Sequence, residues 1–155
     1  MRFITAGESH GKELLGIIEG LPSGLEIKTG QINKYLALRQ SGYGRGGRQK
    51  IERDEVEILS GVRNGLTLGS PLAFCVKNRD WENWKNYMSP ESCDIESKKV
   101  TKVRPGHADL AGMIKYATDD ARNILERASA RETAVRVAGG AVCRAYLAGL
   151  GVLVR

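Results

Sequence analysis

The chain has 155 residues, which corresponds to one domain or to a piece of a larger one and is enough for a hydrophobic core of its own. Apolar residues make up 41% and charged residues 27% of it, and this ordinary globular usage excludes a wholly disordered chain. The formal net charge is +6, and the segment 34–53 holds six cations and one anion. The basic charge is therefore local and predicts an anionic partner, either nucleic acid or a small phosphorylated molecule.

The first third of the chain reads as two strands, a turn and a helix. Residues 2–6 and 14–19 have the apolar composition of strands, and 20–24 forms a turn because it holds two glycines and a proline. Residues 29–38 carry apolar side chains at helical spacing, and the threonine that opens the segment is expected to cap the helix. Residues 40–49 have no periodicity and are expected to form a loop.

The middle of the chain predicts a hairpin followed by a polar excursion. Apolar residues alternate over 56–62 as in a half-buried strand, and Asn64–Gly65 is a strong hairpin signal. Residues 66–76 are then the returning arm. Residues 77–101 are polar, with two tryptophans among charges, and are expected to form a mobile excursion or lid.

The last third predicts two helices. Apolar residues over 110–117 fall on one helical face. Residues 129–132 read Ser-Ala-Arg-Glu, which matches the capping box that opens a helix. The apolar residues of 134–145 continue at helical spacing and are small, so a neighbour is expected to pack closely against the glycines at 139–140.

Cysteine and histidine usage argues against disulfides and metal. Cys75, Cys93 and Cys143 are odd in number and widely spaced, which favours a reducing, cytoplasmic environment. His10 and His107 are the two histidines, and without a C-x-x-C motif we expect no metal site. The apolar runs are far shorter than the roughly 20 residues of a membrane span, and the N-terminus reads as a strand rather than a signal peptide.

The segment Gly7–Gly11, Gly-Glu-Ser-His-Gly, has three interpretations. It fits the G-x-S-x-G nucleophile elbow of serine hydrolases, with Ser9 as nucleophile and His107 available for a triad, but the residues after it do not look helical. It can be a plain glycine-flanked turn. It can also present His10 as a proton donor or an anion ligand, which suits a group that titrates near neutrality.

Three further segments suit an anion. Residues 39–48 alternate arginine with glycine, so that guanidinium forks and exposed backbone can meet carboxylate or phosphate, although a solvated basic loop or a nucleic-acid-binding segment stays open. Residues 104–109 place His107 after a Pro-Gly turn. Residues 127–131 put two arginines around a helix start, where free N–H groups favour anions, although plain capping is an equal alternative.

Taken together, these motifs resemble those of the chorismate synthase family. They occur in family order and span the chain: Gly7–Gly11 (GESHG), Glu19–Leu25 (EGLPSGL), Arg39–Arg45 (RQSGYGR), Ile58–Gly61 (ILSG), Arg104–Leu110 (RPGHADL) and Ser129–Thr133 (SARET). The forms Arg45–Arg48 and Leu125–Arg127 are similar to the branch common in Gram-positive bacteria and their relatives.

The resemblance implies an α+β fold in which antiparallel sheets sandwich helices, with residues 1–155 as the N-terminal part of one domain. It implies elimination of phosphate from 5-enolpyruvylshikimate 3-phosphate, a small polyanion, to give chorismate in the shikimate pathway. The implied cofactor is reduced FMN, which some members reduce themselves with NADPH. A cytoplasmic homotetramer with no nucleic-acid or membrane partner is implied. Family chains are more than twice as long, so activity of 155 residues alone is an open question.

The resemblance also implies roles for individual residues. His10 matches a histidine that protonates the leaving phosphate, and His107 one that protonates the reduced flavin. Arg127, Ala128 and Ser129 match a flavin-contacting tripeptide usually written Arg-Ser-Ser, so that one hydroxyl contact is absent here. The residues implied to bind substrate are Ser9, Arg39, Arg45, Arg48 and Arg131. The residues implied to bind a cofactor, flavin or NADP, are Arg39, Arg45, His107, Arg127, Ala128 and Ser129.

Overall fold

The computed structural model describes residues 1–41 and 53–154. The strands are β1 (Arg2–Ala6), β2 (Glu13–Glu19), β3 (Ser23–Glu26), β4 (Val56–Ser60), β5 (Val62–Arg63), β6 (Leu66–Leu68) and β7 (Leu72–Lys77). The α-helices are α1 (Thr29–Gln40), α2 (Trp81–Met88), α3 (Asp109–Tyr116), α4 (Arg122–Arg127) and α5 (Thr133–Gly149). Two 3₁₀ turns, η2 (Glu96–Lys98) and η3 (Ala130–Glu132), complete the order.

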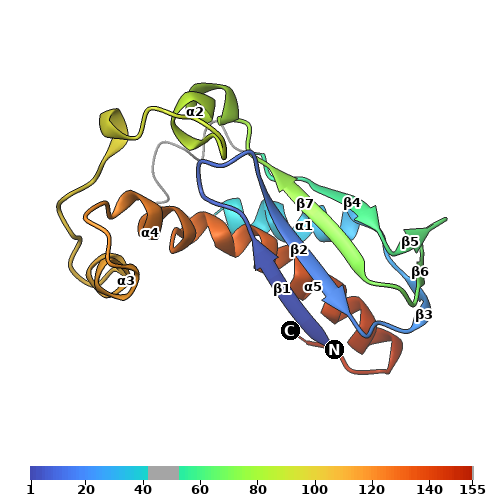
Figure 1. The fold of residues 1–155 in the computed structure, drawn as a ribbon. Helices are drawn as coiled ribbons and strands as arrows, with labels where there is room; N and C mark the ends of the chain where they lie inside the picture. Colours follow the sequence, from blue (N-terminus) through green and yellow to red (C-terminus); the bar gives the residue numbers. More distant parts are fainter. Residues whose placement is uncertain (42–52, 155) are drawn as a thin grey trace.

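The strands form two antiparallel sheets. The larger has the order β1-β2-β7-β4 and the smaller the order β3-β6-β5. Helices α1 and α5 lie against one face of the larger sheet, while α2, α3 and α4 lie beyond one end of it (Figure 1). Antiparallel sheets with separate helices make an α+β fold, as expected from the sequence.

The core lies between the larger sheet and the helices α1 and α5. Since side chains alternate along a strand, Leu14, Gly16 and Ile18 of β2 all point to the helix side, and all three are buried. Gly16 has no room for a larger residue, because an added Cβ would lie 2.5 Å from the ring of Phe74. The small residues of α5 are buried as predicted, and they let that helix sit close to the sheet.

The predicted hairpin forms, but its arms divide between the two sheets. Asn64 and Gly65 both have positive φ, which matches the turn that joins β5 to β6. The single arm predicted over 66–76 is wrong, because the chain breaks at Gly69, with φ of +81°, and at Pro71, which has no N–H. Gly61, with φ of +81°, separates β4 from β5 in the same way.

Two helices differ from expectation in detail. Helix α1 runs two residues longer than predicted, and Lys28 rather than Thr29 precedes its first turn, with no side-chain cap. Helix α3 ends at Tyr116, and its predicted apolar face is exposed at Leu110 and Ile114 within the described part of the chain. The residue that α3 buries is Asp109.

The capping box is half realised. The hydroxyl of Ser129 accepts a hydrogen bond from the Arg131 N–H at 3.3 Å, which caps η3 just before α5. The carboxylate of Glu132 does not close the box in the expected way, because it accepts from Thr5 at 2.7 Å and from Arg136 at 2.7 Å. The acid therefore ties the start of α5 to β1.

The excursion over 77–101 contains secondary structure, namely α2 and η2. Its mobility stays a prediction. Cys75, Cys93 and Cys143 are free thiols. Within 1–41 and 53–154, no cluster of three metal-binding side chains occurs, and no helix is long and apolar enough to cross a bilayer.

Candidate functional site

The Gly7–Gly11 loop is held from two sides at the end of the larger sheet. Gly7 has φ of +100°, a conformation that favours glycine, and this turns the chain as it leaves β1. The N–H of Ser9 donates to the carbonyl of Glu126 at 3.0 Å, and the Asn78 amide donates to the carbonyl of Gly11 at 2.8 Å. The loop is thus fixed to α4 and to the end of β7.

This loop does not have the geometry of a nucleophile elbow. The elbow joins a strand to a helix and exposes its serine hydroxyl. Here the loop joins the antiparallel strands β1 and β2, and Ser9 is only 2% exposed. The arrangement disfavours the serine hydrolase interpretation and leaves His10 as the loop's candidate for chemistry.

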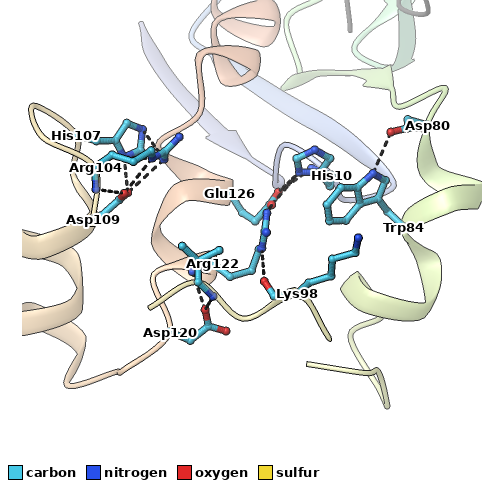
Figure 2. A network of polar contacts seen from close by, with 11 residues as sticks. His10, Asp80, Trp84, Lys98, Arg104, His107, Asp109, Asp120, Arg122 and Glu126 are labelled. Atoms are coloured by element: carbon cyan, nitrogen blue, oxygen red, sulfur yellow. Dashed lines mark hydrogen bonds and ion pairs between the residues drawn. The ribbon is translucent and has the colours of Figure 1, made fainter. Parts of the chain in front are cut away.

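His10 is held by a buried acid and by an aromatic ring. Its Nδ1 lies 2.8 Å from Oε1 of Glu126, whose side chain is 1% exposed, and its backbone N–H donates to Oε2 of the same residue at 2.8 Å. The His10 ring stacks on Trp84 with centroids 3.7 Å apart (Figure 2). Both the edge and the face of the imidazole are therefore fixed.

Trp84 comes from α2, so the excursion over 77–101 contributes to this cluster. Its indole N–H donates to Asp80 at 2.9 Å. Two cations lie over its ring, Lys98 with Nζ 5.2 Å from the centroid and Arg122 at 5.5 Å. Arg122 also donates to Glu126 at 3.2 Å within α4 and to the carbonyl of Lys98 at 2.9 Å. The second bond, with the ring contact to Trp84, links α4 to the segment 77–101.

His107 lies in a second, separate cluster. Its Nδ1 makes a short contact to Asp109, a fully buried acid, and the guanidinium of Arg104 donates to Asp109 at 3.0 Å. Hydrogen bonds from Arg104 hold the pKa of Asp109 well below its usual value despite its burial. Figure 2 shows His107 on the far side of Glu126 and Arg122 from Trp84, without an interaction to His10.

The predicted arginines Arg39 and Arg131 meet on one acid. Asp54 accepts from Arg131 at 2.7 Å and from Arg39 at 2.9 Å. Arg131 is 5% exposed and also donates to the Lys77 carbonyl at 3.1 Å, while Arg39 also donates to Thr133 at 3.0 Å. Both guanidinium groups therefore also support the structure. Arg45 and Arg48 lie outside the described residues.

The predicted tripeptide, residues 127–129, begins at the last residue of α4. Arg127 donates to the carbonyls of Thr5 at 2.9 Å and Gly7 at 3.3 Å, so it anchors the start of the histidine loop. Arg127 and Ala128 also line a cavity of about 630 Å³ between α3 and α4. The other residues that line it include Ala108, Ala111, Gly112, Lys115, Tyr116 and Ile124.

Sequence reasoning missed the acids that organise the site. Asp109 and Glu126 stand inside motifs that were singled out, Arg104–Leu110 and Leu125–Arg127, yet neither had a role assigned. The signal available for both was an acid one or two residues from a candidate functional side chain. The partnership of Glu126 with His10 spans 116 positions, and no local pattern reports it.

Comparisons with known proteins give one consistent family. The sequence model of the chorismate synthase family matches residues 1–155. The chain is similar to chorismate synthases of Geobacter sulfurreducens, with 62% identity over 153 residues, and of Enterococcus faecalis, with 59% identity over 157 residues. These alignments cover 98% and 99% of this chain but 39% and 40% of the relatives.

A solved structure described as chorismate synthase has the same fold. It superposes with a TM-score of 0.74 at 48% identity, over 98% of this chain and 35% of the other. The chain therefore spans about 40% of the length of the curated relatives that it matches.

Proposed function

The chain belongs to the chorismate synthase family, and from that premise we propose that it supplies part of the active site of an enzyme that eliminates phosphate from 5-enolpyruvylshikimate 3-phosphate to give chorismate. The family is one of lyases in aromatic amino-acid biosynthesis. The chain covers only part of its relatives' length, so the proposal concerns the full-length protein.

One observation carries the proposal: two distant motifs meet at the end of the sheet. The loop that bears Ser9 and His10 is bonded to α4 through Glu126, and Arg127 donates to the carbonyl of Gly7. These bonds bring residues that are 116 to 120 positions apart in the sequence into one cluster. His10, a proton donor, and the Arg127 guanidinium, a cation, then belong to one cluster, as departure of a phosphate requires.

In this proposal His10 donates a proton to the departing phosphate. The histidine sits on a loop fixed by hydrogen bonds, so it can present the same ring nitrogen in each turnover. Arg39, Arg45 and Arg48 bind the carboxylates and phosphate of the substrate, with Ser9 and Arg131 in support. An arginine held on an acid such as Asp54 keeps its fork in a fixed orientation while it recognises an anion.

Reduced FMN is the proposed cofactor, and the chemical character of the cavity between α3 and α4 suits it. Most of its lining is apolar, which suits a ring system, and Lys115 and Arg127 supply positive charge for a phosphate. When bound, reduced FMN supplies electron density to the elimination. His107 precedes Ala108 of the lining, and in this proposal it holds a proton near the ring. Ala128 of the lining and Ser129, which follows it in the sequence, are proposed to contribute backbone and hydroxyl contacts.

We further expect a homo-oligomer, a tetramer by analogy with the family, and no nucleic-acid partner. Light scattering of the full-length protein measures the first. The second is measured by binding of generic RNA at two salt concentrations, where an RNA-binding protein loses affinity steeply as salt rises.

The decisive experiment is an anaerobic assay of the full-length protein. Phosphate release and chorismate formation are followed with reduced FMN and, as the control, with oxidised FMN. We expect turnover with the reduced cofactor only, and a loss of about 10²–10⁴-fold in His10→Ala and in His107→Ala. Phosphate release without reduced flavin, or full turnover in both variants, would contradict the proposal.

A further inference from the structure

We propose that Glu126 is the positioning residue of His10: its buried carboxylate holds a proton on Nδ1 of the imidazole, so that His10 exchanges protons with its ligand through Nε2. The kinetic part of this inference rests on the proposed function. The structural part, which concerns the tautomer of the ring, does not.

The geometry assigns both carboxylate oxygens to His10. Oε1 of Glu126 lies 2.8 Å from Nδ1, and Oε2 lies 3.0 Å from Nδ1 and 2.8 Å from the backbone nitrogen of His10. An ionised carboxylate only accepts, so the ring nitrogen that faces it must donate. Proton transfer to any ligand then falls to the other nitrogen, on the opposite edge of the ring.

The acid is fixed as firmly as the ring. Glu126 belongs to α4, its side chain is 1% exposed, and Arg122 one turn earlier donates to it at 3.2 Å. Burial opposes its ionisation, but hydrogen bonds from His10 and from Arg122 outweigh burial and keep the pKa of Glu126 below its usual value. Glu126 is therefore an anion at neutral pH, as the donated bond requires.

The charged groups on the neighbouring elements leave this assignment in place. Trp84 of α2 stacks on the imidazole face, and Asp80 is engaged with the indole N–H rather than with the histidine. Lys98 of η2 lies over the Trp84 ring. Glu126 is thus the one acid with a hydrogen bond to His10 among the contacts seen in residues 1–41 and 53–154.

An arrangement of this kind does more than support the loop. A carboxylate that orients a histidine and selects its tautomer contributes through the histidine. Loss of the acid partner of a metal-bound histidine commonly costs about 10- to 100-fold in activity, and a loss of at least this size is expected here. Since the ring also rests on Trp84, removal of the acid leaves the imidazole in position but free to bind its proton on either nitrogen.

The first test is a double-substitution cycle in the full-length protein. Glu126→Gln keeps the size of the side chain and removes its charge. We expect kcat to fall by at least about 10- to 100-fold, with KM within about threefold. In a His10→Asn background the same substitution should change kcat by less than about twofold, because Glu126 acts through His10. An equal fall of kcat in both backgrounds would overturn the proposal.

The second test needs no activity. Nitrogen-15 NMR of histidine-labelled wild-type protein reports which ring nitrogen carries the proton, and the His10→Asn spectrum identifies the signal. We expect neutral His10 to be protonated on Nδ1 in the wild type and to become a mixture of tautomers in Glu126→Gln. A wild-type ring protonated on Nε2 would refute the assignment even if the variant does not fold.

Glu82→Gln is the matched control, because it removes an exposed acid of α2 that pairs with Lys85 and has no contact with the histidine. It should leave kcat and the tautomer unchanged. If wild-type protein makes no chorismate yet has the Nδ1 tautomer, the proposed function fails and the Glu126–His10 assignment stands. If it makes chorismate and has the Nε2 tautomer, the proposed function stands and the Glu126–His10 assignment fails.

Discussion

Buried carboxylates determine where the basic side chains of this molecule point. Three acids that are at most 5% exposed each hold two basic partners. The sets are Asp54 with Arg39 and Arg131, Asp109 with Arg104 and His107, and Glu126 with Arg122 and His10. Five of the six bases come from motifs that the sequence marked as anion or proton sites. A carboxylate carries a single negative charge. Each acid therefore orients two basic side chains but does not neutralise two positive charges.

Asp109 should make the stability of the protein depend on acid pH. The bond from Arg104 lowers its pKa in the folded state below the ordinary value of 3.8. A lowered pKa means stability that is present above about pH 4 and is lost as the pH falls below that value. Asp109→Asn should therefore be less stable than wild type near neutrality, and the difference should shrink toward about pH 2.

Urea unfolding at a series of pH values measures this difference directly. Asp119→Asn is the control, since Asp119 is an exposed acid that pairs with Lys99 on the surface. It should leave the pH profile close to that of wild type. A gap between Asp109→Asn and wild type that stays constant from neutral pH into acid would show that the Asp109 charge does not contribute.

At the scale of elements, the start of α5 combines capping with the proposed role in flavin binding. The Ser129 hydroxyl accepts from the Arg131 N–H at 3.3 Å. Ser129→Ala should lower the free energy of unfolding by about 1 kcal/mol. If the tripeptide also holds flavin, FMN affinity measured by fluorescence should fall beyond what this loss explains, whereas a stability loss with normal affinity would leave Ser129 as a cap alone.

The paired glycines of α5 offer a second prediction with a built-in control. An added Cβ at Gly139 would lie 2.6 Å from the ring of Phe3, whereas at Gly140 it would meet no atom within 4 Å. Gly140→Ala should raise the free energy of unfolding by about 1 kcal/mol, the helix-propensity gain. Gly139→Ala makes the same gain but must displace a ring, so thermal melting should rank it below Gly140→Ala. Equal melting temperatures would contradict the close contact with Phe3.

Helices, strands and turns that depend on local sequence patterns were predictable, whereas the segments against which they pack or pair were not. The strands over 2–6 and 14–19 and the Asn64–Gly65 turn follow from short-range composition. That β5 and β6 leave the larger sheet depends on the glycines at 61 and 69, whose left-handed φ the pattern of alternation does not reveal. The close packing expected for both glycines of α5 holds for Gly139 only, since one helical residue faces the sheet and the next faces away.

At the scale of the whole molecule, the site depends on contacts that join distant segments. The motifs themselves were recognisable, because each needs only a few residues in order. Their assembly was not, because the bonds of Glu126 to the histidine loop and of Asp54 to Arg131 span 116 and 77 positions. Such partners are chosen by topology, and an acid looks the same in sequence whether it is buried or solvated.

We expect the Asp54 cluster, in which Asp54 binds Arg39 and Arg131, to be the long-range contact most sensitive to substitution. Asp54 precedes β4, Arg39 lies in the last turn of α1 and Arg131 lies in η3, so one carboxylate joins three elements. The Asp54 and Arg131 side chains are 1% and 4% exposed, so loss of the acid removes the negative charge that lies 2.7 Å from a buried cation. Asp54→Asn should then lower the free energy of unfolding by about 3–5 kcal/mol, a large share of the total for a domain.

Urea unfolding measures the loss. The control is Glu57→Gln in β4, which removes an exposed pair with Lys77 and should leave the urea midpoint nearly unchanged. If the two variants unfold at the same urea concentration, the Asp54 cluster is not what holds these elements together.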